Sequence, residues 1–176
     1  MRTIVSTAIA CAIAAAIPAA QSANPISDGI RSQWNGAKRN LQQSSEMMPE
    51  SGYDYRPVDG VRNFGEILAH LAGANYVFCA AAKGEKTPFA EDHFEKAAKT
   101  RAAIIKATSE SIAYCDAAFS ALTDASAGQM VQQPFGEGQA PRAGVLVAEL
   151  GHVNEHYGNL VTYFRINGIV PPSSRR

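Results

Sequence analysis

Residues 141–167 read PRAGVLVAELGHVNEHYGNLVTYFRIN, and this stretch carries the most informative pattern in the chain. Its apolar side chains recur at intervals of three and four residues, which predicts one long helix. Pro141 suits the first turn of that helix, whereas Gly168 and the pair Pro171-Pro172 end it. Two different sides of the predicted helix are apolar, and such a helix is buried among neighbouring helices.

Three further stretches have helical periodicity, and we expect no strand. The additional helices are expected at residues 25–48, 63–83 and 91–122. The segments 50–62 and 124–140 contain recurring Gly and Pro residues, which favour turns and loops. Four long helices in one small domain predict an all-α four-helix bundle.

The first 23 residues have the pattern of a secretory signal peptide. Arg2 precedes an apolar, Ala-rich run from Ile4 to Ile17, which is too short to span a bilayer. Ala20-Gln21-Ser22 then offers small residues for cleavage. We therefore predict an exported protein, periplasmic or extracellular, without a stable membrane anchor. Its mature domain covers residues 24–176, and a retained N-terminal anchor is the alternative.

The charge balance argues against nucleic acid as a partner. Sixteen Lys and Arg residues balance sixteen Asp and Glu residues among the 176 residues of the chain. No run of basic residues is available to neutralise phosphates. The segment 24–176 is long enough for one domain with a core and too short for two.

Two cysteines, Cys79 and Cys115, lie in the predicted mature domain. In an oxidising compartment they can form one disulfide bond. Each also occupies a position that suits a small buried apolar residue, which is how a free cysteine behaves. Sequence spacing alone leaves both alternatives open.

Three of the four histidines lie on helix faces that are expected to point inward. His152 and His156 are four residues apart, so they share one helical face within reach of a common ion. His70 lies between Ile67 and Leu71 on the apolar side of the helix expected at 63–83. The fourth, His93, lies among acidic residues and is expected to be exposed.

A divalent metal ion explains the three inward histidines together. A single buried histidine is more often a hydrogen-bonded core residue, but three of them would need several additional polar partners. Neutral imidazoles suit Zn, Ni or Fe, and three of them leave coordination positions open to water or substrate. We therefore predict a mononuclear metal site formed by His70, His152 and His156.

Two catalytic motifs overlap this region. His152 to His156 matches H-x-x-E-H, an inverted zincin motif in which the glutamate acts as a base, but too few residues follow to supply the further acidic ligand. Glu149 and His152 match the Glu-x-x-His of di-iron bundles, although a second copy is missing. A mononuclear site fits better, with Glu155 as the candidate general base. Asn159 is a candidate for orienting the ligands, and Tyr157 is expected to pack in the core.

Two segments resemble the DinB-like metal-binding superfamily. They are residues 64–71, FGEILAHL, and residues 152–172, HVNEHYGNLVTYFRINGIVPP. The resemblance extends over residues 34–172. It implies an up-down-down-up four-helix bundle with a metal between the second and fourth helices, held by three histidines that match His70, His152 and His156.

The resemblance also suggests an activity. Relatives with assigned reactions carry out metal-assisted thiol transfer with low-molecular-weight thiols, or a related isomerisation, and they act inside cells. The family name refers to damage-inducible expression and implies no DNA chemistry. We expect a metal-dependent enzyme, hydrolytic or transferring a thiol or another group. The alternatives are a non-catalytic metal-binding or sensing bundle, and a structural bundle without metal. An anionic or thiol small molecule is the expected partner, and homodimerisation is left open.

Overall fold

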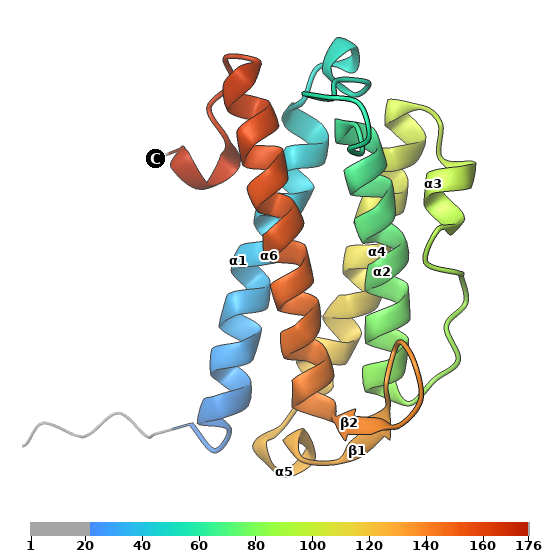
Figure 1. The fold of residues 1–176 in the computed structure, drawn as a ribbon. Helices are drawn as coiled ribbons and strands as arrows, with labels where there is room; N and C mark the ends of the chain where they lie inside the picture. The colour runs from blue at the N-terminus through green and yellow to red at the C-terminus, as the bar shows by residue number, and fades with distance from the viewer. Residues whose placement is uncertain (1–21, 176) are drawn as a thin grey trace, which may run out of the picture.

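The computed structural model describes residues 22–175, and this part of the chain is mainly helical (Figure 1). Four long helices dominate it: α1 (Pro25–Met47), α2 (Phe64–Lys83), α4 (Arg101–Ala121) and α6 (Arg142–Ile166). The prediction of a mainly helical fold is confirmed. The predicted signal peptide, apart from its last two residues, lies outside the described residues. Among the residues that the structure describes, no helix is both long and apolar enough to cross a membrane.

The core lies between these four helices. Helices α1 and α2 each pack against both α4 and α6. Trp34 of α1 stacks on Phe119 of α4 with ring centroids 4.5 Å apart, and Phe64 of α2 meets Phe164 of α6 edge to face at 5.1 Å. Helix α2 is buried on almost every side. A polar side chain on α2 therefore faces protein in nearly every direction.

Local capping fixes where α2 begins and ends. The Asn63 side chain accepts a hydrogen bond from the Glu66 backbone, and the Glu66 carboxylate accepts one from the Asn63 backbone. This reciprocal capping box satisfies two otherwise unpaired donors. Gly84 ends the helix with a φ of +74°, a conformation that glycine adopts without strain. The register of α2, and with it the place of His70, follows from these two ends.

The expected helix at 91–122 is wrong as a single element. The structure has a short helix, α3 (His93–Ala97), followed by a break before α4. Ala98 is extended, and the Thr100 side chain caps α4 by accepting a hydrogen bond from the backbone N–H of Ala103. This capping hydrogen bond pairs one of the backbone N–H groups that the start of a new helix leaves without a helical partner. Because of the break, α3 packs against α2, as the contacts between these helices show.

The segment 124–140, expected to be loop without strands, contains regular structure as well. It holds the helix α5 (Asp124–Ala127) and the antiparallel strands β1 (Met130–Gln132) and β2 (Gln139–Pro141). Gly136 and Gly138 have φ values of +75° and +109°, so the connection between the strands needs residues without a Cβ. The expectation of a segment without strands is wrong, because these glycines form the turn of a short hairpin. Two short 3-10 helices, η1 (Glu50–Gly52) and η2 (Pro172–Ser174), complete the fold.

A disulfide bond joins α2 to α4. Cys79 and Cys115 are bonded, with Cα atoms 5.3 Å apart, and they are 36 positions apart in sequence. Both cysteines are completely buried. Of the two alternatives left open by the sequence, the structure has the bridge. A cross-link of this length stabilises the fold mainly by restricting the unfolded chain.

Candidate metal centre

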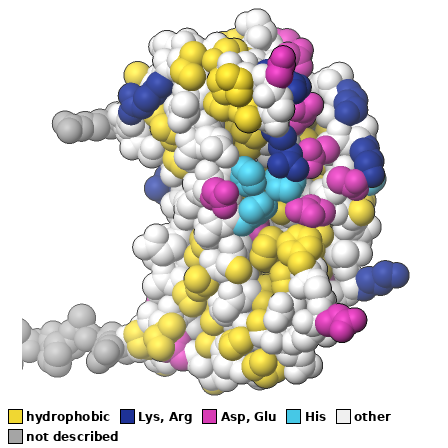
Figure 2. Space-filling view, in the orientation of Figure 1, with side chains coloured by type: hydrophobic (Ala, Val, Ile, Leu, Met, Phe, Trp, Pro, Cys, Tyr) yellow, Lys and Arg dark blue, Asp and Glu magenta, His cyan; other side chains and the backbone are white. Residues whose placement is uncertain are grey.

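Three histidines converge where α2 faces α6. His70 comes from the middle of α2, and His152 and His156 come from successive turns of α6. The Nε2 atoms of His70 and His152 are 3.1 Å apart, and one ring nitrogen from each of the three residues lies within 4.8 Å of the others. Figure 2 shows histidine side chains gathered on one face, between a charged area and an apolar area. The structure thus brings together the three residues that the sequence singled out.

The spacing of these nitrogens suits a single ion. In a tetrahedral zinc site with Zn–N bonds of about 2.0–2.1 Å, two ligand nitrogens are about 3.3 Å apart. The observed 3.1 Å between His70 and His152 is close to that value, and the 4.8 Å limit for the set leaves only small movements to complete coordination. The donor set is imidazole alone, which suits Zn, Ni or Fe.

The two histidines of α6 are held in their neutral form. Burial lowers the pKa of His152 to about 4, with smaller contributions from His156 and His70. Burial also lowers the pKa of His156, and His70 acts in the same direction. A metal ligand must be deprotonated, and a ligand with a low pKa needs no proton removed at neutral pH. Both residues therefore have a free nitrogen lone pair at pH 7.

A carboxylate orients the His70 ring. Nδ1 of His70 donates to Oε1 of Glu95 at 3.1 Å, and Arg62 Nε donates to Oε2 of the same carboxylate at 3.0 Å. Since a carboxylate accepts only, Nδ1 of His70 carries the proton and Nε2 carries the lone pair. That lone pair faces His152. Outer carboxylates of this kind are typical of histidines that bind metals.

A second glutamate, Glu91 at the end of the 84–92 connection, approaches the other ring nitrogen of His70. Oε1 of Glu91 is 3.9 Å from Nε2 of His70. Its backbone lies directly against Gly73, where an added Cβ would stand 1.8 Å from the Glu91 carbonyl oxygen. Only a residue without a Cβ permits this approach. The helix predicted at residues 91–122 gave no sign of these contacts of Glu91 and Glu95, because one continuous helix does not bring both residues to His70.

Glu149 lies behind His152 and is completely buried. Its Oε2 is 3.9 Å from Nδ1 of His152. Burial, and then the negative charge of Glu91, raise the pKa of Glu149 to about 8. The sequence indicated this residue through the Glu-x-x-His pattern, but it gave no sign that the carboxyl group is buried.

An aromatic wall borders the histidines on the other side. Phe78 of α2 lies nearly parallel to the His152 ring, with centroids 5.7 Å apart and an interplanar angle of 28°. Phe135, from the connection between β1 and β2, packs edge to face on Phe78 at 5.4 Å. Phe135 is 46% exposed. The unpredicted hairpin therefore supplies an apolar surface next to the site.

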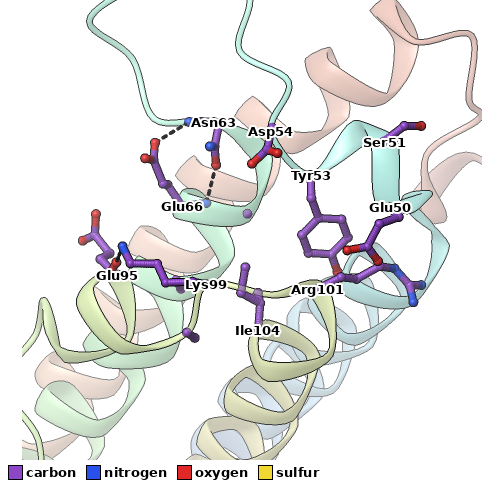
Figure 3. A pocket seen from close by; sticks show the side chains of 13 residues that line it. Glu50, Ser51, Tyr53, Asp54, Asn63, Glu66, Glu95, Lys99, Arg101 and Ile104 are labelled. Carbon is purple, nitrogen blue, oxygen red and sulfur yellow. Dashed lines mark hydrogen bonds between the residues drawn. The ribbon is translucent and has the colours of Figure 1, made fainter.

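Two cavities lie near the centre, and only one reaches a histidine. A cavity of about 510 Å³ is lined by His156 together with Arg62, Asn159 and Tyr163. The other, of about 580 Å³, lies between η1 and the first turns of α2 and α4 (Figure 3). It includes Glu95 but none of the three histidines. Of these two cavities, the smaller one therefore borders the histidine cluster.

The remaining candidate residues have distinct positions. Glu155 is exposed on α6, and its negative charge raises the pKa of His156 against the dominant effect of burial. Nδ2 of Asn159 is 3.4 Å from Nδ1 of His156, so Asn159 does contact one of the three clustered histidines. The Tyr157 hydroxyl accepts a hydrogen bond from the Ser173 backbone, and its ring is buried, as expected of a core residue. His93 is partly buried and lies outside the histidine cluster.

The fold and this cluster agree with a sequence-based assignment. The model of the DinB superfamily matches residues 33–160, which is more than half of the chain, so the protein belongs to the DinB superfamily. No curated protein matches the sequence significantly.

Solved structures share the fold at low sequence identity. A DinB-like protein from Bacillus cereus is 17% identical with a TM-score of 0.64, and the alignment covers 82% of this chain and 95% of that one. A DinB-like protein from Bacillus subtilis is also 17% identical, with a TM-score of 0.63 and coverage of 84% and 99%. The mycothiol-dependent maleylpyruvate isomerase is 15% identical, with a TM-score of 0.62. The alignment covers 76% of this chain but only 60% of the isomerase.

Proposed function

We propose that the protein is a metal-dependent enzyme that holds one divalent transition metal, Zn, Ni or Fe, through His70, His152 and His156. The observation that carries the proposal is the convergence of three imidazoles from α2 and α6, with ligand atoms within 4.8 Å of one another. The low pKa values of His152 and His156 support it, because both residues are ready to bind an ion at neutral pH.

A bound ion would act as a Lewis acid toward water or substrate at a position that the imidazoles leave open. The chain's own residues prepare that position. Glu95 holds the His70 ring through Nδ1, and Phe78 packs on the His152 ring. Glu91 has a carboxylate oxygen 3.9 Å from His70 Nε2, so it is placed to accept a proton from a group bound there. Glu155, which is exposed, is the other candidate for that role.

The surroundings favour a small ligand with an anionic or ionisable group. The cavity beside His156 offers the Arg62 guanidinium and the Asn159 amide to such a group. The isomerase with a similar fold depends on mycothiol, which makes low-molecular-weight thiols one class to test. Hydrolysis and thiol or group transfer are both compatible with this site.

A non-catalytic metal-binding or sensing bundle is the second candidate. The observation in its favour is again Glu91, because a carboxylate so close to His70 can fill the open position. A filled site holds its ion without admitting a substrate.

The helix arrangement and the location of the protein belong to the same proposal. We assign an up-down-down-up order to α1, α2, α4 and α6. The long connection that joins the end of α2 to the start of α4 contains α3 and returns along the side of the bundle, which supports this order (Figure 1). We also propose export to the periplasm or the exterior. The disulfide between Cys79 and Cys115 supports export, since such bonds persist in oxidising compartments.

Chelation separates the two candidate functions. Purified protein would be assayed against thiol-transfer and ester substrates before chelation, after it, and after zinc, nickel or iron is restored. An enzyme loses turnover on chelation and regains it with one of the metals. A sensing or storage bundle binds the same metal and shows no turnover in any of these states.

A further inference from the structure

Three buried polar atoms beside the histidine cluster have no hydrogen-bond partner among residues 22–175. They are both carboxylate oxygens of Glu149 and Nδ1 of His152. Glu149 has no exposed surface, and its Oε2 is 3.9 Å from that Nδ1. Buried polar groups are nearly always paired, so two unpaired groups side by side call for an explanation.

The tautomer of His152 provides the explanation. A neutral imidazole has one N–H and one lone pair, and the group bound at one nitrogen determines what the other carries. Nε2 of His152 faces Nε2 of His70 at 3.1 Å, so Nε2 is the nitrogen directed at the proposed ion. With its lone pair used there, the proton of His152 lies on Nδ1. That N–H then faces the carboxyl group of Glu149.

We propose that Glu149 is the positioning residue of His152, accepting the Nδ1–H hydrogen bond when Nε2 binds a metal ion. This inference rests on the proposed metal site. A shortening of about 1 Å turns the 3.9 Å contact into an ordinary hydrogen bond. The two residues are three positions apart on α6, so a rotation of the Glu149 side chain is enough and the backbone need not move.

Glu149 would thereby repeat on α6 what Glu95 does on α2. Glu95 already accepts from His70 Nδ1, but it shares its charge with Arg62. Among the described residues, Glu149 has no salt bridge to Lys or Arg, so no cation competes with the His152 Nδ1–H for its oxygens. Carboxylates behind ligand histidines fix the ring and make it a stronger donor.

Zinc titrations of matched variants test the inference. Glu149→Leu removes the acceptor and keeps the side chain apolar and of similar size. Glu149→Gln keeps an acceptor oxygen and loses the charge. Leu160→Ala, at a completely buried position further along α6, is the control for a general loss of packing. We expect zinc affinity to fall about 10–100-fold in Glu149→Leu and less in Glu149→Gln, with Leu160→Ala unchanged.

A second measurement needs no variant to fold. In zinc-loaded wild-type protein with ¹⁵N-labelled histidine, nuclear magnetic resonance should show a protected Nδ1–H proton on His152 that is absent from the metal-free form. Wild-type zinc affinity in Glu149→Leu, or zinc bound to His152 with no protected Nδ1–H, would overturn the role of Glu149 and leave the metal site standing. Failure of the wild-type protein to bind zinc, nickel or iron would remove both proposals.

Discussion

The carbonyl oxygen of Glu91 lies 1.8 Å from the point that a Cβ on Gly73 would occupy. The contact fastens the 84–92 segment to α2 one turn after His70. It involves backbone on the Glu91 side, which cannot rotate away as a flexible side chain can. Gly73 of α2, which has no side chain, thereby helps to position Glu91 and Glu95 beside the histidines.

Gly73→Ala should consequently destabilise the protein. The added methyl group forces the Glu91 backbone away from α2, and overpacking of this kind costs about 1–3 kcal/mol. Gly36→Ala is a matched control within α1, where an added Cβ meets nothing within 4 Å. That change should raise the free energy of unfolding by about 0.5–1 kcal/mol through helix propensity. Urea denaturation measures both, and equal effects of the two substitutions would show that the Gly73 contact is unimportant.

The disulfide should make a large contribution to stability. Replacing both Cys79 and Cys115 with alanine removes a cross-link that closes a loop of 36 residues, so the free energy of unfolding should fall by about 2–4 kcal/mol. The histidines are not bonded to either cysteine, so metal affinity should be unchanged in the folded double variant. A denaturation midpoint that is the same in oxidised and reduced wild-type protein would count against the bridge.

The pH dependence of the metal-free protein should reveal the buried carboxyl group. The pKa of Glu149 is raised from 4.5 to about 8, so the folded state binds more protons than the unfolded state between these values. Stability from this group is greatest at low pH and is lost as the pH rises toward 8. The pKa of His152 is lowered from 6.5 to about 4, so its effect is opposite in sign and confined to pH values below 6.5.

Between pH 6.5 and 8, therefore, Glu149 dominates the difference in bound protons between the folded and unfolded states. In the presence of a chelator, the urea midpoint of the wild-type protein should fall across this window. The midpoint of Glu149→Gln should stay nearly constant, since an amide does not titrate. A fall of equal size in both proteins would mean that some other group is responsible.

Anionic ligands should stabilise only the metal-loaded protein. Small thiols or carboxylates that bind at the ion should raise the melting temperature of the zinc form, because a ligand that binds the folded state alone stabilises it. Arg62→Met, which removes the guanidinium at the cavity wall, should reduce the rise. Thermal denaturation with and without chelator tests this. Equal stabilisation of both forms would place the ligand elsewhere.

Helical periodicity was sufficient to find the three histidines. The face of a helix on which a residue lies follows from sequence spacing alone, both for the two histidines four residues apart on α6 and for His70 in the apolar stripe of α2. The positions of the carboxylates around the histidines depend on helix breaks and tertiary contacts, which periodicity does not predict. Glu91 and Glu95 reach His70 only because the helix is interrupted between Ala98 and Thr100, which lets α3 pack against α2. A short capping residue such as Thr100 is compatible with both a continuous helix and a new one, so tertiary packing decides. The burial of Glu149 likewise depends on neighbours distant in sequence.

Metal content is the direct test of a site formed by the three histidines. The protein would be purified without a polyhistidine tag, as wild type and as the variants His70→Ala, His152→Ala, His156→Ala and His93→Ala, and analysed for metals by elemental mass spectrometry. We predict one zinc, nickel or iron ion per chain in wild type and in His93→Ala, and a sharp loss in each of the other three variants. Full occupancy in folded His152→Ala, or a wild-type protein that holds no transition metal even after exposure to all three ions, would contradict it.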